Sequence, residues 1–212
     1  RRSAQQGKVY AQYAMGVACQ FGEGTPKNLT SSTKWFAKAA KQGEADAQCA
    51  LGEAYENGTG GKQDLVKAVE WYEKAAGQGS SWGQLSLGYA YANGHGVRED
   101  DEEAVKWFKL SADQGDSDAL YKLALAYDVG WVVAEDPKMA AHLAKNAAEQ
   151  GHSRAQAHLG DLYDEGRGVR KNAKAAFRWY EKSAAQNNPD SLVVLGWKYF
   201  FGNGTSVDKK KA

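Results

Sequence analysis

Residues 47–79 read AQCALGEAYENGTGGKQDLVKAVEWYEKAAGQG, and this pattern returns every 36 residues along the chain. A tryptophan column, with Leu143 in the fourth copy, contains Trp35, Trp71, Trp107 and Trp179. A glycine column, with Ala124 in the fourth copy, contains Gly16, Gly52, Gly88, Gly160 and Gly196. A tyrosine column, with Cys19 in the first copy, contains Tyr55, Tyr91, Tyr127, Tyr163 and Tyr199. A fixed period of this size predicts an array of stacked structural repeats.

Each repeat carries two helical patterns. In the first pattern, Ala47, Leu51 and Tyr55 are four residues apart and form one stripe of an α-helix. The second pattern spans residues 68–76, where alanine and aromatic residues recur at helical spacing. The small residues let the helix backbones approach, and we expect Trp71 and Tyr55 to fill the space beside Gly52. Neither helix can bury its stripe alone, so neighbouring repeats must stack.

The ends of the predicted helices carry their own signals. A glycine after the first helix, Gly58 in the second copy, supplies a left-handed cap. An Asx residue opens the second helix, where its side chain accepts hydrogen bonds from free backbone N–H groups. These Asx residues are Asn28, Asp64, Asp100, Asp136, Asn172 and Asp208.

The fourth copy departs from the pattern in its loop. Gly130, Trp131 and Val132 replace the Gly-x-Gly of the other copies. Valine adopts a positive φ only with strain, so we expect this loop to have a different shape. The change is either neutral drift or a local bend that exposes Trp131.

The repeats define the organisation of the chain. They cover residues 10–43, 47–79, 83–115, 119–151 and 155–187, with a partial copy at 191–212. We expect residues 1–212 to form a single array without an internal domain boundary. Residues 2–7 match residues 74–79, which form the end of a second helix. Ala212 falls in the column of Ala68, which lies at the start of a second helix. Both ends lie within a repeat, so we expect an excerpt of a longer array.

Composition excludes several classes of protein. The net charge is +1, which gives no bulk attraction to nucleic acid or to a membrane surface. No apolar run approaches the length of a membrane span. Cys19 and Cys49 do not make a disulfide framework, and we expect two free thiols. The compartment stays open.

The pattern resembles the Sel1-like repeat family, a relative of the tetratricopeptide repeat with units of 36 residues. The matching residues are clearest in the fifth copy. They are Ala155, Leu159, Gly160, Tyr163, Gly166, Gly168, Val169, Asn172, Ala176, Trp179, Tyr180, Ala184 and Ala185. The resemblance covers essentially the whole chain. It implies an all-α fold, a right-handed α/α superhelix (solenoid) of helix-turn-helix repeats, with first helices lining a concave side. It also implies a scaffold or adaptor that binds other proteins.

Helical geometry indicates which positions of the first helix point away from the core. Each residue turns the helix by about 100°, so positions 46, 49, 53 and 56 lie roughly opposite Leu51. The tetratricopeptide resemblance adds position 57. Over six copies, nine of these thirty positions are acidic, one is basic and nine are aromatic. Cys49 and Asp128 are among them.

These positions predict an acidic, aromatic-lined groove that binds a peptide or protein with basic and apolar side chains. The partner-binding candidates are Tyr13, Trp82, Leu85, Tyr89, Tyr121, Trp197, Asp46, Glu53, Asp118 and Asp161. Two other interpretations stay open. The aromatic residues can belong to the core, or, for Tyr10, Phe200 and Phe201, pack on neighbouring repeats. The acidic residues can simply be solvated.

Residues suited to catalysis or metal binding form no convincing set. His152, His158 and Asp161 are spaced closely enough to offer metal ligands, but histidines on solvated helices need no ligand. We therefore predict no metal, no cofactor and no enzyme activity. We expect a monomer with a protein or peptide partner, without nucleic acid or membrane insertion. The alternative function is a structural spacer that makes its contacts through the array ends or the convex face.

Overall fold

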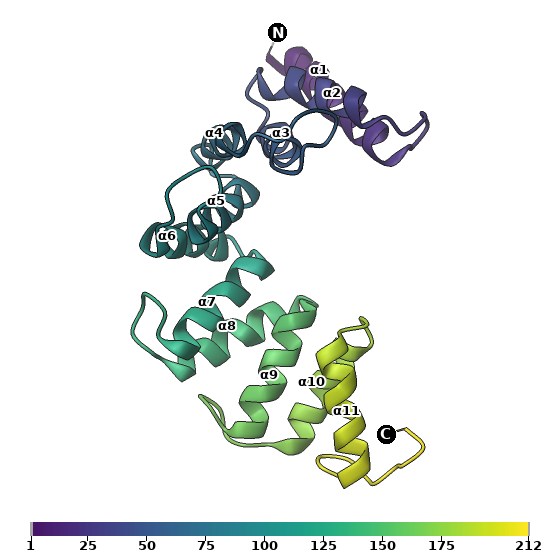
Figure 1. Cartoon of the computed structure of the whole chain (residues 1–212), viewed down its shortest axis with the longest axis vertical. Coiled ribbons are helices and arrows are strands. Elements are labelled where there is room, and N and C mark those ends of the chain that lie inside the picture. Colours follow the sequence, from purple (N-terminus) through teal and green to yellow (C-terminus); the bar gives the residue numbers. More distant parts are fainter. Residues whose placement is uncertain (1, 212) are drawn as a thin grey trace. The chain divides into compact units, whose positions relative to one another are not determined.

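The computed structural model describes the backbone of residues 2–211 and the side chains of residues 7–211. Within these residues the chain forms eleven α-helices and no strand, so the predicted all-α class is confirmed (Figure 1). The helices are α1 (Arg2–Phe21), α2 (Leu29–Ala40), α3 (Ala45–Asn57), α4 (Leu65–Ala76), α5 (Ser81–Asn93), α6 (Asp101–Asp113), α7 (Ser117–Val129), α8 (Pro137–Glu149), α9 (Ser153–Glu165), α10 (Ala173–Ala184) and α11 (Pro189–Phe201).

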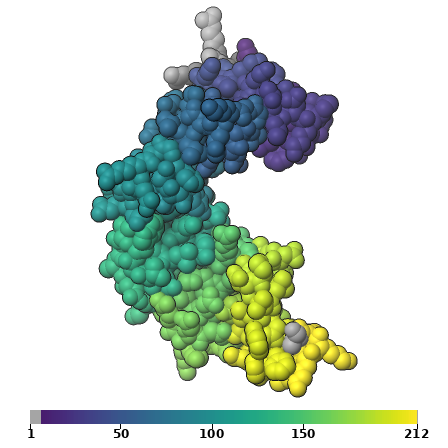
Figure 2. Space-filling view, viewed as in Figure 1, coloured from purple at the N-terminus to yellow at the C-terminus, as the bar shows by residue number. Residues whose placement is uncertain are grey.

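The helices belong to two compact units. Unit 1 covers residues 1–111, with α1 to α5 and most of α6, and unit 2 covers residues 112–212, with α7 to α11. Odd-numbered helices are the first helices of the repeats and even-numbered helices are the second helices. Within each unit, helices that follow one another in sequence adjoin in space (Figure 2).

In four of the repeats, a glycine of the first helix faces an aromatic ring of the following second helix. A Cβ atom added at Gly52 would lie 2.5 Å from the ring of Tyr72, closer than any real contact allows. The same contact joins Gly16 to Phe36, Gly88 to Phe108 and Gly160 to Tyr180. The pattern favoured Trp71 and Tyr55 for this space, and that prediction is wrong. Tyr72 is only 3% exposed, whereas Trp71 stays partly exposed with the Lys74 ammonium 3.9 Å from its ring centroid.

The fourth repeat replaces this contact with a matched pair of small residues. Ala124 stands in the glycine column and Ala144 stands in the column of the aromatic ring. Both alanines are fully buried. The methyl group of Ala124 replaces the hydrogen of glycine, and the small side chain of Ala144 replaces the aromatic ring. The larger residue at one position is therefore compensated by the smaller residue at the other.

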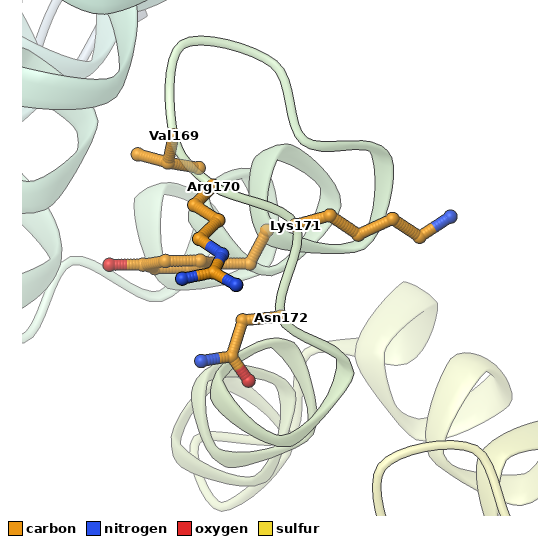
Figure 3. A pocket seen from close by; sticks show the side chains of 5 residues that line it. Val169, Arg170, Lys171 and Asn172 are labelled. Atoms are coloured by element: carbon orange, nitrogen blue, oxygen red, sulfur yellow. The ribbon is translucent and has the colours of Figure 1, made fainter.

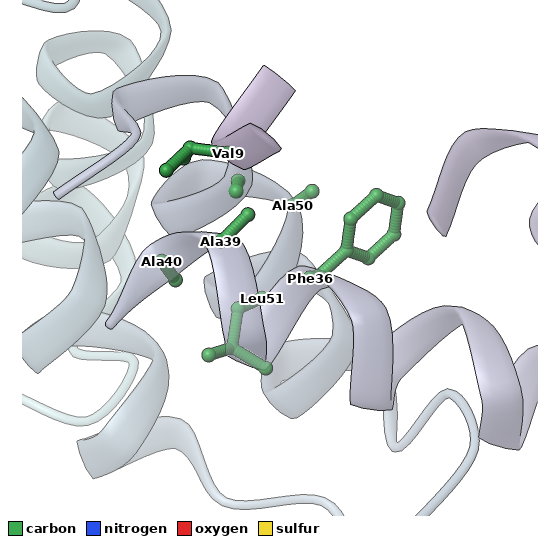
Figure 4. Close-up of a cluster of buried hydrophobic side chains, with 7 residues drawn as sticks. Val9, Phe36, Ala39, Ala40, Ala50 and Leu51 are labelled. Atoms are coloured by element: carbon green, nitrogen blue, oxygen red, sulfur yellow. The ribbon is translucent and has the colours of Figure 1, made fainter. Parts of the chain in front are cut away.

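The hydrophobic core runs between neighbouring helices. In unit 1, one buried cluster joins three helices (Figure 4). Its members are Val9 of α1, Phe36, Ala39 and Ala40 of α2, and Ala47, Ala50 and Leu51 of α3. The many alanines keep the helices close, and the burial of each cluster requires helices from two repeats.

The predicted helix caps are confirmed. The Asx side chains at the start of the second helices accept hydrogen bonds from backbone N–H groups, as Asn28 does from Ser31 at 2.9 Å. Gly58 ends α3 with φ 66°, and its equivalents end α5, α7, α9 and α11 in the same left-handed conformation.

Two local predictions are wrong. Val132 has φ 63°, so the loop of the fourth repeat keeps the backbone conformation of Gly60 and bears the strain of a β-branched residue there. The helix end expected at Gly7 is also missing, because α1 continues through it from Arg2 to Phe21. An unbroken helix satisfies backbone groups that a turn would leave open. Ala212 lies outside the described residues.

We expect Gly52→Ala to lower the free energy of unfolding by about 1–3 kcal/mol, because the new methyl overlaps the Tyr72 ring. In a Tyr72→Ala background the same change should cost close to nothing, since the pair then matches the fourth repeat. Urea denaturation of the four proteins gives this double-mutant cycle. Gly61→Ala, with nothing within 4 Å of the new Cβ, is the control. An equal cost in both backgrounds would show that the ring is not the obstacle.

Val132→Gly should raise the free energy of unfolding by about 1 kcal/mol, because it removes left-handed strain from an exposed residue. Asn187 has φ 60°, a conformation that asparagine tolerates better than valine, so Asn187→Gly should change stability less. Thermal unfolding of both variants compares them. A loss of stability in Val132→Gly would mean that packing of the valine outweighs the strain.

Candidate functional site

The ten candidate residues lie on the first helices and none is fully buried. They fall in three columns of the repeat. The columns contain Asp46, Trp82 and Asp118; Tyr13, Leu85 and Tyr121; and Glu53, Tyr89, Asp161 and Trp197. We call the described residues in these three columns the first-helix face of each unit.

Two other residues predicted to face the groove are buried instead. Cys49 is 0% exposed, and burial raises the pKa of its thiol to about 11. Asp128 is 6% exposed and lies 3.0 Å from a guanidinium nitrogen of Arg167. A helical wheel gives the direction of a side chain but not the depth of neighbouring helices, so these two predictions are wrong. Cys19 is also buried, and both cysteines are free.

In unit 1 the aromatic residues of the first-helix face rest on the core. The ring of Tyr13 lies 5.7 Å from that of Phe36, and Tyr89 packs edge-on to Phe108 at 5.5 Å. Trp82 packs on the same cluster as Tyr13. Each of these side chains remains partly exposed. The core therefore fixes one side of each ring and leaves the other accessible.

Glu53 and Tyr13, on the first-helix face of unit 1, lie in mostly negative surroundings. Burial, and then repulsion by Glu56, raise the pKa of Glu53. Burial, followed by the charges of Asp46 and Glu44, raises the pKa of the Tyr13 hydroxyl. The charged groups that shift these two pKas are all anionic when ionised. This part of the face would gain from a nearby positive charge.

In unit 2, Tyr121 lies between two histidines. Its ring centroid is 4.8 Å from that of His152 and 6.3 Å from that of His158. His152 accepts a hydrogen bond from the Ala155 N–H through Nδ1 and so caps α9. Its Nε2 therefore carries the proton and donates to Asp118 at 3.0 Å.

The capping role of His152 belongs to a column that the sequence analysis overlooked. A side chain caps each of the first helices α3 to α11, and these caps are Glu44, Ser80, Asp116, His152 and Asn188. The signal was available, since each of these residues occupies the same place 36 residues apart and three of the five, Ser80, Asp116 and Asn188, are typical caps.

His158 is a buried partner of Asp128. Its Nε2 lies 3.7 Å from a carboxylate oxygen of Asp128, and no hydrogen bond reaches that nitrogen within the described residues. Burial, the largest effect, lowers the pKa of His158, while the Asp128 carboxylate opposes the shift. Arg167 also donates to the backbone carbonyl of Asp128 at 2.6 Å, so the loop after α9 is tied to α7.

Tyr121 and Asp161 share one open pocket of about 420 Å³ in unit 2. Asp161 accepts a hydrogen bond from the Tyr180 hydroxyl at 2.6 Å, and burial raises the pKa of its carboxyl group. Trp197 lies on α11, where it is 61% exposed and stacks on Phe201 with centroids 5.7 Å apart. The face of unit 2 thus holds both a polar pocket and an exposed aromatic pair.

A second hollow of unit 2, about 550 Å³, lies beside the loop before α10 (Figure 3). Arg170 and Lys171 are its two basic residues, and their charged groups point apart. They do not converge on a single anion.

Nothing in the described part of the chain assembles a metal site. No three histidine, cysteine or acidic side chains in it are placed to hold one ion. His152 and His158 instead face Asp118 and Asp128, so the trio weighed from the sequence does not converge. Among the same residues, no helix is both long and apolar enough to cross a membrane.

Comparison with known proteins identifies the repeats. The family model described as Sel1 repeat matches residues 9–44, 45–80, 83–116, 117–152, 153–188 and 189–212. No curated protein matches the chain.

Solved structures give closer likenesses. One is c5321, a protective antigen present in uropathogenic Escherichia coli strains that displays an SLR fold. The two chains are 38% identical and superpose with a TM-score of 0.87, and the match covers 99% of this chain and 45% of c5321. A Sel1 repeat protein from Oxalobacter formigenes is 35% identical and has a TM-score of 0.87. This match covers 96% of this chain and 81% of the Oxalobacter protein. This chain therefore spans less than half the length of c5321.

We expect His158 to make stability depend on pH. Its pKa is lowered in the folded chain, so the unfolded chain takes up a proton first, near the ordinary value of about 6.5. The free energy of unfolding should therefore fall as the pH drops from about 7 towards the folded pKa. His158→Gln should flatten this fall, measured by urea denaturation.

His142→Gln serves as the control, because His142 is exposed on α8 and its side-chain partner among the described residues is Asn146. An NMR titration of the wild-type chain should place the His158 midpoint below about 6.5. A midpoint above that value would show that Asp128 outweighs burial.

Proposed function

The chain belongs to the Sel1 repeat family, and on that premise we propose that it is a non-catalytic scaffold that holds a polypeptide partner against its first-helix face. Sel1 repeat proteins generally mediate protein–protein interactions, and members of the family are typically not catalysts.

The partly exposed aromatic residues carry the proposal. Tyr13, Trp82 and Tyr89 each pack on the core and remain partly exposed. A ring held in this way loses little conformational freedom when a partner covers it, and aromatic anchors dominate binding energy in most interfaces. Leu85 and Tyr121 occupy the same column as Tyr13 and share its partial exposure.

Charge supports a partner with basic as well as apolar side chains. Asp46 and Glu53 in unit 1, and Asp118 and Asp161 in unit 2, are exposed beside the aromatic residues. Burial and Glu56 disfavour the ionised form of Glu53. A lysine or arginine from the partner would relieve this repulsion, which favours an extended or helical basic segment.

The second helices offer a less accessible surface for the contacts that a structural spacer would make. Three of their tryptophans are already covered by lysines of the same helix, with ammonium groups about 4 Å from the ring centroids. The pairs are Trp35 with Lys38, Trp71 with Lys74 and Trp179 with Lys182. A partner docking there would have to displace these cation–π contacts.

We predict that Tyr89→Ala and Tyr121→Ala each weaken binding at least about tenfold, because a buried aromatic anchor contributes about 2 kcal/mol or more. The ligand is a peptide selected on the intact chain from a random phage library, and affinity is measured by calorimetry. Leu110→Ala on α6 and Met139→Ala on α8 remove exposed apolar side chains from second helices and should leave affinity unchanged.

Two results would contradict the proposal. One is full affinity in both tyrosine variants with the helical content unchanged by circular dichroism. The other is a loss of binding in Leu110→Ala or Met139→Ala, which would move the binding surface to the second helices.

A further inference from the structure

The pocket of unit 2 opens between α7, α9 and the start of α11. It has a volume of about 420 Å³, enough for one long side chain. Its walls are Tyr121 from α7, Arg154, Ala157, His158 and Asp161 from α9, and Asn188 and Asp190 at the start of α11.

Hydrogen-bond acceptors predominate in this pocket. One carboxylate oxygen of Asp161 accepts from the Tyr180 hydroxyl, and the other has no donor among the described residues. Asp190, in the first turn of α11, has no ion pair among those residues either. Burial raises the pKa of the Tyr121 hydroxyl, Arg154 opposes this shift, and the Asp161 and Asp190 carboxylates add to it. The hydroxyl oxygen is a further acceptor.

His158 adds an acceptor while it is neutral. Its Nε2 is buried and lies 3.7 Å from the Asp128 carboxylate, so a proton on that nitrogen is favoured. Nδ1 is then left with a lone pair. Burial lowers the pKa of the ring, so the neutral form prevails at neutral pH.

The charges in the pocket are unequal. Asp161 and Asp190 give two negative charges, and Arg154, exposed at the rim, gives one positive charge. Asp161 is partly desolvated, as the raised pKa of its carboxyl group shows. An opposite charge beside such a carboxylate interacts more strongly than it would in water. The complementary ligand is a cation with several N–H donors.

We propose that this pocket binds one basic side chain, lysine or arginine, of a protein partner. The proposal deepens the function proposed above, because the first-helix face of unit 2 would bring the partner's chain to the pocket. Asp161 and Asp190 supply the charge, and Tyr121 and His158 supply neutral acceptors.

Acid should weaken this site. Protonation of His158 turns its free nitrogen from an acceptor into a donor and adds a positive charge. The groups that face His158 are Tyr121 and Asp128 of α7, Asp161 and Glu165 of α9, and Arg167 of the following loop. His158 is the histidine of this group, so its protonation should dominate the change as the pH falls below the ordinary histidine value of about 6.5.

The test uses four blocked tripeptides with lysine, arginine, norleucine or glutamate between two glycines. They are titrated into the intact ¹⁵N-labelled chain near pH 7. We expect lysine or arginine to shift the amide signals of Ala157 and His158 with a millimolar dissociation constant, and norleucine and glutamate to bind at least about tenfold more weakly. The comparison of lysine with arginine identifies which cation the site prefers.

Matched variants locate the effect. Asp161→Asn and Asp190→Asn should each weaken lysine binding at least about fivefold. Glu149→Gln removes the same charge from the exposed surface of α8 and should not weaken it. His158→Gln should abolish the loss of affinity between about pH 7 and pH 5.5.

Equal binding of lysine and norleucine, or tighter binding of glutamate, would overturn the proposal. Equal effects of Asp190→Asn and Glu149→Gln on lysine binding would also overturn the proposal. Unlike Asp161→Asn, neither substitution alters the hydrogen bond from Tyr180. If the selected peptide still loses affinity in Tyr89→Ala and Tyr121→Ala, binding at the first-helix face is supported and only the proposal of a pocket for a basic side chain is rejected.

Discussion

The contact between a glycine of the first helix and an aromatic ring of the second sets how closely the two helices of a repeat pack. At Gly52 the missing side chain leaves room for the Tyr72 ring, which fills the space completely. Close packing makes the cost of any extra methyl group high. The pair Ala124 and Ala144 shows the same constraint from the other side, because the opposing residue shrinks where the glycine gains a methyl.

This constraint divides the columns of the repeat into two kinds. The two columns that contain Gly52 and Tyr72 hold small or aromatic residues, and their departure in the fourth repeat is a compensating pair. Columns on the first-helix face vary freely, as in Glu53, Tyr89, Asp161 and Trp197, which occupy one column. The scaffold therefore fixes where a side chain is presented and leaves its chemistry open, which is the property a binding surface requires.

The two units use this freedom differently. In unit 1 the charges that act on Tyr13 and Glu53 are all anionic. In unit 2, Arg154 opposes the effect of the carboxylates on Tyr121, and Arg167 acts on His158. The charges around these residues are therefore acidic in unit 1 and of both signs in unit 2.

The sequence was sufficient for the helices of the repeats and for the caps of the second helices, because these follow from period, helical spacing and capping chemistry. It was insufficient where the answer depended on a neighbour. The burial of Cys49 and Asp128 depends on how deeply adjacent helices cover them, and the choice of Tyr72 over Trp71 depends on which of two consecutive rings meets the glycine. Val132 is the instructive case. Its strained φ shows that the geometry of a repeat can override the preference of a single residue, because both flanking helices fix the loop at its ends. The column of a residue within the repeat therefore predicts its backbone conformation better than its residue type does. The residues that it contacts can be identified only from the structure.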